Sequence, residues 1–311
     1  MDDMNDEPRW FFPRGDLTRD GWQTVVDGDL AGWQHTGLRI GELRDGVSST
    51  LAAGGVERMV VPLAGDVVIE WSDDRGGSGT VELAGRASVF DGPADVAYLG
   101  VRTEAVVTGH GRVAVAEAPA DQVLDVQVLR RDDIPVEIRG AGRATRQVHN
   151  FGTPDGLHAQ KLIVCEVVTP AENWSSYPPH KHDEAVPGTE SRLEEIYYFE
   201  SAVGRGLDAP EQADPFGMFA TYGSPAGPID VNELVRTGDV ALVPHGYHGP
   251  AVAAPGYDLY YLNVMAGPDP ERAWLITDDP AHGWVRAGWE SQAPDPRLPY
   301  LPTAASKGPR P

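Results

Sequence analysis

The chain alternates between short apolar runs and turn residues. The runs are rich in Val, Ile, Leu, Ala and aromatic side chains, and long windows of helical period are rare. Glycine and proline, at 36 and 27 residues, interrupt the chain often. This pattern predicts an all-β fold of short strands. The expected strands span residues 59–63, 66–71, 87–90, 96–99, 112–116, 162–168, 196–199, 218–222, 239–243 and 257–264.

The expected strands fall into two blocks that resemble each other weakly. Residues 85–93 and 238–246 each contain a Gly turn, then an apolar run, then a tight turn. A repeat of such long period indicates two similar β-barrels, joined near residues 130–155. We therefore expect an N-terminal barrel over residues 1–145 and a C-terminal barrel with a tail over residues 146–311.

Histidines are concentrated in the second block. The first 140 residues contain only His35 and His110. The other seven are His149, His158, His180, His182, His245, His248 and His282. A histidine metal site is therefore expected in the C-terminal barrel, and the N-terminal barrel is expected to lack metal ligands.

Three segments of the second block carry candidate metal ligands. His180 and His182 are two residues apart, so on a strand both rings leave the same face and can bind one ion. The alternative is a pair of surface histidines on a proline-rich loop. We choose Glu194 as the carboxylate ligand from its offset to the apolar residues that follow, and keep Glu195 as the alternative. His248 is preferred to His245, which occupies the more exposed position of its turn.

Three imidazoles and one carboxylate suit a divalent ion. Zn²⁺, Mn²⁺ and Fe²⁺ all accept this ligand set, and we expect one ion, with Zn²⁺ or Mn²⁺ as the first choice. Four protein ligands leave a coordination position open in a five- or six-coordinate ion. An open position is typical of a catalytic site.

Composition excludes several other classes of protein. The formal net charge is −22, from 47 acidic and 25 basic residues, so the surface would repel nucleic acid. The single cysteine, Cys165, excludes an intrachain disulfide framework. No apolar run is long enough to span a membrane and no signal peptide is evident, so we expect a cytoplasmic location. Residues 1–8 and 303–311 are expected to be disordered tails.

The same segments resemble known families. The H-x-H pair, the downstream glutamate before an aromatic strand, and the G-x5-P-x-G turn followed by His248 are marks of the cupin superfamily. Two departures are the longer insert at residues 183–193 and the single residue between Gly246 and His248. A closer resemblance covers most of the chain and is to the 5-deoxy-glucuronate isomerase family of bacterial myo-inositol catabolism. It is carried by residues 143–151, 173–183, 193–199, 246–248 and 253–267.

This resemblance implies a bicupin, two tandem jelly-roll-like barrels with one metal in the C-terminal barrel. The implied ligands are His180, His182, Glu194 and His248. The implied reaction is an aldose–ketose isomerisation that converts 5-deoxy-D-glucuronate to 5-dehydro-2-deoxy-D-gluconate through an enediol. The expected partner is therefore a small sugar acid, and homo-oligomer formation is left open.

The residue that moves the proton is not fixed by sequence. Candidates are Glu195, His149 and Tyr261, with Asp183 beside them. For the substrate carboxylate we prefer Arg146 and Lys161 to Arg143 and Arg192, because they adjoin expected strand starts.

Two other functions and one structural question stay open. The other functions are an iron-dependent cupin dioxygenase and a sugar-binding cupin without activity. The insert at residues 183–193 is either a lid over the site or an ordinary mobile loop.

Overall fold

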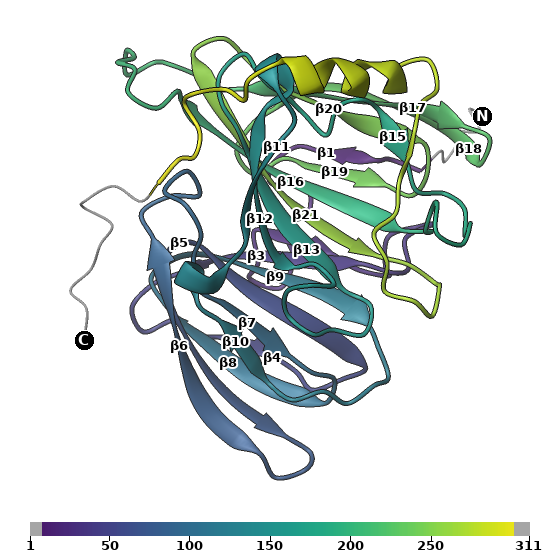
Figure 1. Cartoon of the computed structure of the whole chain (residues 1–311). Helices are drawn as coiled ribbons and strands as arrows, with labels where there is room; N and C mark the ends of the chain where they lie inside the picture. The colour runs from purple at the N-terminus through teal and green to yellow at the C-terminus, as the bar shows by residue number, and fades with distance from the viewer. Residues whose placement is uncertain (1–7, 302–311) are drawn as a thin grey trace, which may run out of the picture.

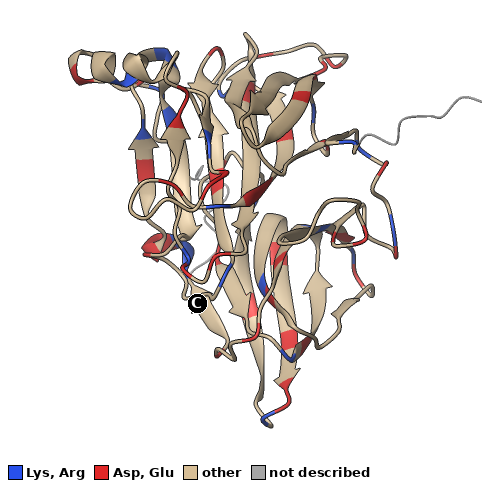
Figure 2. Cartoon of the chain, turned by 90° about the vertical axis from the view of Figure 1, so that its right-hand side faces the viewer, with Lys and Arg blue, Asp and Glu red and all other residues tan. Residues whose placement is uncertain are grey.

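The computed structural model describes residues 8–301, and its regular secondary structure is almost entirely β-strand (Figure 1). The predicted all-β fold class is confirmed. The tails expected at residues 1–8 and 303–311 lie, apart from Pro8, outside the described residues. Within residues 8–301, no helix is both long and apolar enough to cross a membrane. Acidic residues are spread over both halves of the molecule (Figure 2).

The N-terminal half forms one extended nine-stranded sheet around the long strand β5. The strands of its main path, in order, are β10 (Gln127–Leu129), β7 (Val96–Leu99), β5 (Val56–Asp73), β9 (Gly111–Pro119), β3 (Gly37–Leu43) and β2 (Thr24–Val26). Off this path lie β4 (Ser49–Leu51), β6 (Ser78–Arg86) and β8 (Thr103–Gly109).

Strand β5 corrects the prediction of two separate strands at residues 59–63 and 66–71. It is continuous over 18 residues and bends at Gly65, whose φ is 77°. A Cβ at this position would lie 2.0 Å from the backbone oxygen of His110, so only glycine fits. The two arms of β5 pair with different neighbours on either side of this bend.

The strand predicted at residues 87–90 is a turn instead. The guanidinium of Arg86 donates to the backbone oxygen of Gly92 at 2.7 Å and closes the turn. Its counterpart in the second half does contain a strand, β19 (Val240–Val243). The sequence similarity between residues 85–93 and 238–246 therefore does not extend to their structure.

The C-terminal half consists of two sheets that face each other. The seven-stranded sheet has the order β1 (Phe11–Phe12), β19, β16 (Glu194–Val203), β21 (Tyr257–Ala266), β13 (Ile163–Thr169), β12 (Arg146–Gly152) and β11 (Val136–Arg139). The six-stranded sheet has the order β18 (Gly227–Val235), β17 (Gly217–Ser224), β20 (Tyr247–Ala253), β15 (His180–Lys181) and β22 (Thr277–Asp278), with β14 (Trp174–Ser175) paired to β20. Hydrogen bonding does not close these sheets into a barrel, so the expected jelly-roll-like unit is open at its edges.

Both faces of the seven-stranded sheet are buried. Along β16, Tyr197 and Phe199 pack into the space between the two C-terminal sheets, whereas Ile196 and Tyr198 pack against the N-terminal half. This alternation follows from the two-residue period of a strand. It decides which polar residues of β16 reach the inside of the C-terminal half.

Strands β1 and β11 both pair with the C-terminal sheet, although they precede the expected boundary at residues 145 and 146. The domain division stays a prediction, with these two strands crossing it.

A buried ion pair also joins the halves. Arg86 binds Glu166 through two hydrogen bonds of 2.7 and 2.6 Å. The Glu166 carboxylate also accepts hydrogen bonds from Tyr260 and His149, each 2.7 Å long.

Candidate metal centre and cavity

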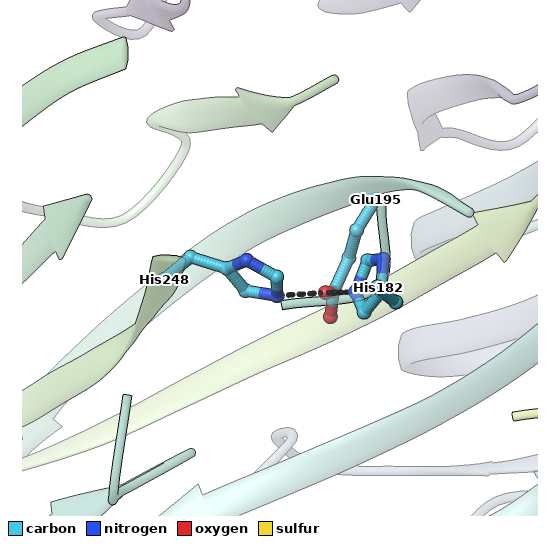
Figure 3. A group of neighbouring side chains, drawn as sticks. All are labelled: His182, Glu195 and His248. Carbon is cyan, nitrogen blue, oxygen red and sulfur yellow. Dashed lines mark hydrogen bonds and ion pairs between the residues drawn. The ribbon is translucent and has the colours of Figure 1, made fainter. Parts of the chain in front are cut away.

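Three buried side chains from different strands meet inside the C-terminal half (Figure 3). His182 follows β15, Glu195 lies on β16 and His248 lies on β20. One carboxylate oxygen of Glu195, Oε2, lies 2.9 Å from Nε2 of His182 and 2.9 Å from Nε2 of His248. The topology thus brings together residues that are up to 66 positions apart in the sequence, from 182 to 248.

His180 lies beside this cluster. It is the direct antiparallel partner of His248, and their ring centroids are 4.8 Å apart. The rings of His180 and His182 are 6.3 Å apart. Close packing here depends on Gly249, whose φ is 115° and whose Cβ would lie 2.2 Å from the backbone oxygen of Ser176. The three histidines expected from the sequence are therefore neighbours of one another and of one carboxylate. This carboxylate belongs to Glu195 and not to Glu194.

The three histidine rings are anchored to the backbone through the same ring nitrogen. Their Nδ1 atoms lie 3.2, 2.9 and 2.8 Å from the backbone oxygens of Pro178, Leu193 and Gly246. A carbonyl only accepts, so each Nδ1 carries a proton, and each Nε2 is the nitrogen left to bind a metal ion or a second proton. Backbone acceptors of this kind commonly orient histidine ligands of metals.

The donor set fits a divalent cation. The buried Nε2 of His248 has no aligned hydrogen-bond partner among the described residues, although a carboxylate oxygen lies 2.9 Å away. Burial and the neighbouring His248 lower the pKa of His180 well below its usual value, which keeps this ring neutral. Burial alone would raise the pKa of Glu195, but the contacts with His182 and His248 lower it, so the carboxylate is ionised. Neutral imidazoles and a carboxylate around one point are the donors that Zn²⁺ and Mn²⁺ accept.

Glu194 is not part of this cluster, and the choice of Glu194 as the ligand is wrong. Its side chain lies on the opposite face of β16 and accepts hydrogen bonds from the backbone N–H groups of Gln34, at 3.1 and 3.2 Å, and His35, at 2.6 Å. Glu195, kept as the alternative, lies in the cluster instead. Its predicted role in proton transfer stays a prediction.

A cavity of about 460 Å³ adjoins the cluster. Glu195 and His180 contribute to its wall, as do three arginines, Arg139, Arg146 and Arg286. The remaining wall is formed by Val148, Val167, Ser176, Tyr261, Asn263, Trp274, Ile276 and Asp278. Its volume is in the range of about 300–1,000 Å³ that is typical of small-molecule sites.

Arg146 differs from the other two arginines of the cavity. Arg139 pairs with Glu137 at 2.6 Å, and Arg286 pairs with Asp278 at 2.7 Å. Arg146 is buried and donates to the backbone oxygen of Ala144 at 3.1 Å, but no acidic partner lies beside it within residues 8–301. Burial lowers its pKa to about 10, so the group remains a cation at neutral pH. An unpaired buried cation in a cavity is poised to receive an anion.

Of the residues predicted to move protons, Tyr261 lies in the cavity wall. Its hydroxyl is 2.7 Å from the hydroxyl of Ser176. Burial raises the pKa of Tyr261 to about 12, which keeps the phenol neutral.

His149 lies on the opposite face of the sheet, bonded to Glu166 at 2.7 Å. The prediction of a catalytic His149 is therefore wrong. Asp183 belongs to the insert and accepts a hydrogen bond from the backbone N–H of Gly246 at 2.9 Å.

The other predicted anion-binding residues lie outside the cavity. Lys161 donates to the backbone oxygen of Asp269 at 2.5 Å, so its expected role in substrate binding is not supported by its position and is corrected. Arg192 pairs with Asp269 at 2.6 Å, and Arg143 pairs with Glu172 at 3.0 Å, both in exposed positions. Proximity to a strand start thus correctly placed Arg146 at the cavity but wrongly placed Lys161 there.

The insert at residues 183–193 contains a hairpin whose base is bonded to the segment that carries the two histidines. Its residues Val186 and Glu190 form a β-bridge. The buried Glu190 carboxylate accepts hydrogen bonds from Nζ of Lys181, at 2.7 and 3.0 Å, and from the backbone N–H groups of Asp183 and Glu184. The lysine between the two histidines therefore fastens the insert to the strand that carries them.

Sequence reasoning missed several residues of the cavity wall. The polar ones are Arg139, Ser176, Asn263, Asp278 and Arg286. A signal was available for Asn263, which is two residues from Tyr261 and so shares its face of β21. The sequence contained no such signal for Arg286, because it lies on the separate 3-10 helix Gly283–Ser291.

Comparisons with known proteins agree with this picture. Residues 11–285 match the model of the KduI/IolB family. The 5-deoxy-glucuronate isomerase of Geobacillus kaustophilus (strain HTA426) is 35% identical over 285 residues, which cover 89% of this chain and 95% of that protein. The protein of the same name from Bacillus subtilis (strain 168) is 35% identical over 266 residues, covering 84% and 90% of the two chains.

Solved structures show the same fold. The crystal structure of an IolB-like protein from Salmonella typhimurium LT2 has a TM-score of 0.78 and 34% sequence identity, and covers 89% of this chain and 99% of that one. An oxalate decarboxylase from Lactobacillus farciminis has a TM-score of 0.60 at 11% identity, covering 87% and 88%. The second likeness concerns the fold alone, and it agrees with the bicupin expected from the sequence.

Proposed function

The chain belongs to the KduI/IolB family, and on this premise we propose that it is a metal-dependent isomerase of 5-deoxy-D-glucuronate. The product is 5-dehydro-2-deoxy-D-gluconate. One observation carries the proposal: a single cavity joins a cluster of metal-ligating groups to a buried arginine without an acidic partner. A sugar acid has the two features that such a cavity recognises, a carbonyl with a neighbouring hydroxyl at one end and a carboxylate at the other.

The proposed ligands of the metal are His180, His182, Glu195 and His248. Zn²⁺ or Mn²⁺ is the proposed ion, because three neutral imidazoles and a carboxylate suit both. When bound, the ion supplies a Lewis acid that favours negative charge on the oxygens of the reacting carbons. The protein's part is to hold the donors in place through the three backbone acceptors of the Nδ1 protons.

Arg146 is proposed to bind the carboxylate of the substrate. A guanidinium can bind a carboxylate through two parallel hydrogen bonds, which also fixes the direction of the sugar chain. Burial strengthens this interaction, because little water competes for the charge. Arg139 and Arg286 already have acidic partners and add positive potential around it.

Tyr261 and Ser176 are proposed to handle hydroxyl protons of the substrate. In an aldose–ketose isomerisation, a proton moves from carbon C2 to carbon C1, and a hydroxyl proton moves from O2 to O1. The neutral Tyr261 hydroxyl is 2.7 Å from that of Ser176, and each group can both donate and accept. Such a pair can carry a proton between neighbouring oxygens without a change in its own charge.

The proposal is tested by a product assay on 5-deoxy-D-glucuronate together with elemental analysis of the purified protein. We expect turnover and about one metal ion per chain. His182→Ala should lose both, and His245→Ala should keep both, because His245 lies outside the cluster with its Nε2 near the backbone oxygen of Pro228. An unaltered rate in metal-free His182→Ala, or no product from the wild type, would refute the proposal.

None of these observations supports the two alternatives left open by the sequence, an iron-dependent dioxygenase and a sugar-binding protein without activity. Oxygen consumption by the iron-loaded protein in place of isomerisation would favour the dioxygenase. Sugar binding without turnover would favour the non-enzymatic protein.

A further inference from the structure

The cavity wall changes its chemical character from strand to strand. Four strands lie side by side in the order β16, β21, β13 and β12. On the cavity face, β16 carries the ionised Glu195, and β21 carries the neutral hydrogen-bonding groups Asn263 and Tyr261. Next, β13 contributes only Val167, and β12 contributes Val148 and then Arg146. The wall thus runs from metal ligand through neutral polar groups to an apolar pair and a cation.

Strand register fixes this order. Tyr261 is the direct partner of Val167, and Val167 is the direct partner of Val148. Arg146 precedes Val148 by two residues on the same strand and so shares its face. The two valines therefore form a continuous apolar strip beside the arginine. Val148 is 1% exposed and Val167 is 4% exposed.

The polar section of the wall also points to a ligand. The Nδ2 group of Asn263 is buried and has no hydrogen-bond partner among the described residues. A buried amide without a partner is unfavourable, so native proteins usually satisfy it with another protein group, water or a ligand. A substrate hydroxyl in the cavity would accept this hydrogen bond.

The order of the wall matches the order of groups along the proposed substrate. 5-Deoxy-D-glucuronate has an aldehyde at C1, hydroxyls at C2 to C4, a methylene at C5 and a carboxylate at C6. We propose, on the basis of the function proposed above, that Val148 and Val167 contact the C5 methylene and select the deoxy sugar. Asn263 then binds a hydroxyl of the middle section, and Arg146 binds the C6 carboxylate.

The placement runs diagonally across the sheet. Neighbouring strands are about 4.8 Å apart, so the backbones of β16 and β12 lie about 14 Å apart across the strands. Through β21, Glu195 is level with Ile163 of β13, whereas Val148 is level with Val167, four residues further along. The substrate chain would therefore run obliquely, with the long side chains of Glu195 and Arg146 reaching into the cavity from its two ends.

The valine pair discriminates between two closely related sugars. D-Glucuronate differs from the deoxy sugar by a hydroxyl at C5. Against two valines this hydroxyl would lose its hydrogen bonds to water and gain none from the wall, which is unfavourable. An apolar pocket rejects an added hydroxyl by about 100-fold in kcat/KM.

The test exchanges a valine methyl for a hydroxyl. Val148→Thr and Val167→Thr are nearly isosteric and place a hydrogen-bonding group beside C5. Each variant is given D-glucuronate and 5-deoxy-D-glucuronate in competition, and the ratio of the two kcat/KM values is compared with that of the wild type. Competition in one tube makes the ratio independent of the fraction of folded enzyme.

We expect the ratio to move towards D-glucuronate by about tenfold or more in at least one variant. Val164→Thr is the matched control, because Val164 is buried on the other face of β13, in the core shared with the N-terminal half. Its ratio should equal that of the wild type. If a threonine variant is too unstable to assay, Val148→Ala, which admits water beside C5, should move the ratio in the same direction.

The result separates this inference from the proposed function. A wild type that does not turn over 5-deoxy-D-glucuronate would remove the proposed function and this inference with it. An active wild type whose ratio does not change in any of these cavity variants would overturn the inference alone. A shift as large in Val164→Thr as in the cavity variants would also overturn it.

Discussion

Two adjacent glutamates on β16 provide the sharpest test of the metal centre. Glu195→Gln and Glu194→Gln make the same chemical change one residue apart, but on opposite faces of one strand. The structure places only the first beside His182 and His248, at 2.9 Å from both. The two variants should therefore fail in different ways.

Glu195→Gln removes the one anionic donor of the cluster. Changes to groups that merely support metal ligands lower metal affinity by about 10- to 100-fold. Loss of a ligand charge should exceed this, so we expect at least about 100-fold, or ~2.7 kcal/mol at 1.36 kcal/mol per factor of ten. Isomerase activity should fall with the metal content. The fold should persist, because glutamine has the size of glutamate.

Glu194→Gln should leave the metal in place and weaken the contact between the halves. Its carboxylate binds the N–H groups of Gln34 and His35 over distances of 2.6 to 3.2 Å. Glutamine keeps one acceptor oxygen but turns an amide donor towards the other N–H. Hydrogen bonds to charged groups contribute about 1.5–3 kcal/mol, so we expect a loss of stability of about 2 kcal/mol.

Three measurements separate the variants: metal content by elemental analysis, metal affinity by competition with a chelator, and stability by urea denaturation. The expected pattern is a metal defect for Glu195→Gln and a stability defect for Glu194→Gln. The opposite pattern, with metal lost from Glu194→Gln and retained by Glu195→Gln, would show that the assignment of the ligand is wrong.

Three further predictions concern two buried arginines and the removal of the metal. Arg146→Met should lower kcat/KM by about 100-fold without loss of stability, since an unpaired buried cation is itself unfavourable; an unchanged kcat/KM for the sugar acid would contradict its role. Arg86→Met should destabilise the protein by about 3–5 kcal/mol at pH 7, because it leaves the buried Glu166 carboxylate unpaired. Burial alone would raise the pKa of Glu166, but Arg86 and His149 hold it below the unfolded value of about 4.3. The stability that this pair contributes is therefore present above about pH 5 and declines as the pH falls. The difference in free energy of unfolding between wild type and Arg86→Met, measured from denaturation curves, should become smaller below about pH 4. A difference that stays constant with pH would contradict this prediction. Chelator treatment should lower the thermal midpoint of the wild type by an amount equivalent to about 2.7 kcal/mol at a metal concentration of 100 Kd, and should leave His182→Ala unshifted.

Much of the architecture could be predicted from the sequence. The short apolar runs gave most of the strands, and the concentration of histidines gave the half that carries the cluster. The failures were local. The run at residues 87–90 is apolar enough for a strand, but the contact of Arg86 with the oxygen of Gly92 makes it a turn. Strand β5 is continuous because Gly65 permits a bend in which hydrogen bonding continues on both sides.

The sequence predicted which types of residue form the candidate site, but it was less successful in predicting which individual residues do so. The histidine pair and His248 lie where strand period and turn pattern placed them. Glu194 was chosen wrongly because β16 is buried on both faces, so its apolar residues do not show which face is the inside. His149 failed for the same reason, since it lies on the face of β12 that packs against the N-terminal half.

The sequence alone determined which donors exist and how they repeat along each strand, because a two-residue period is a property of the backbone itself. It also determined the excess of acidic residues, and with it the scarcity of cations available for an anionic substrate. Only the tertiary structure decided which face of each strand looks into the cavity. That choice depends on how the sheets pack against each other, which involves contacts between residues far apart in the chain. It made Glu195 a member of the metal cluster, gave Glu194 a structural contact, and left Arg146 without an acidic partner in the cavity.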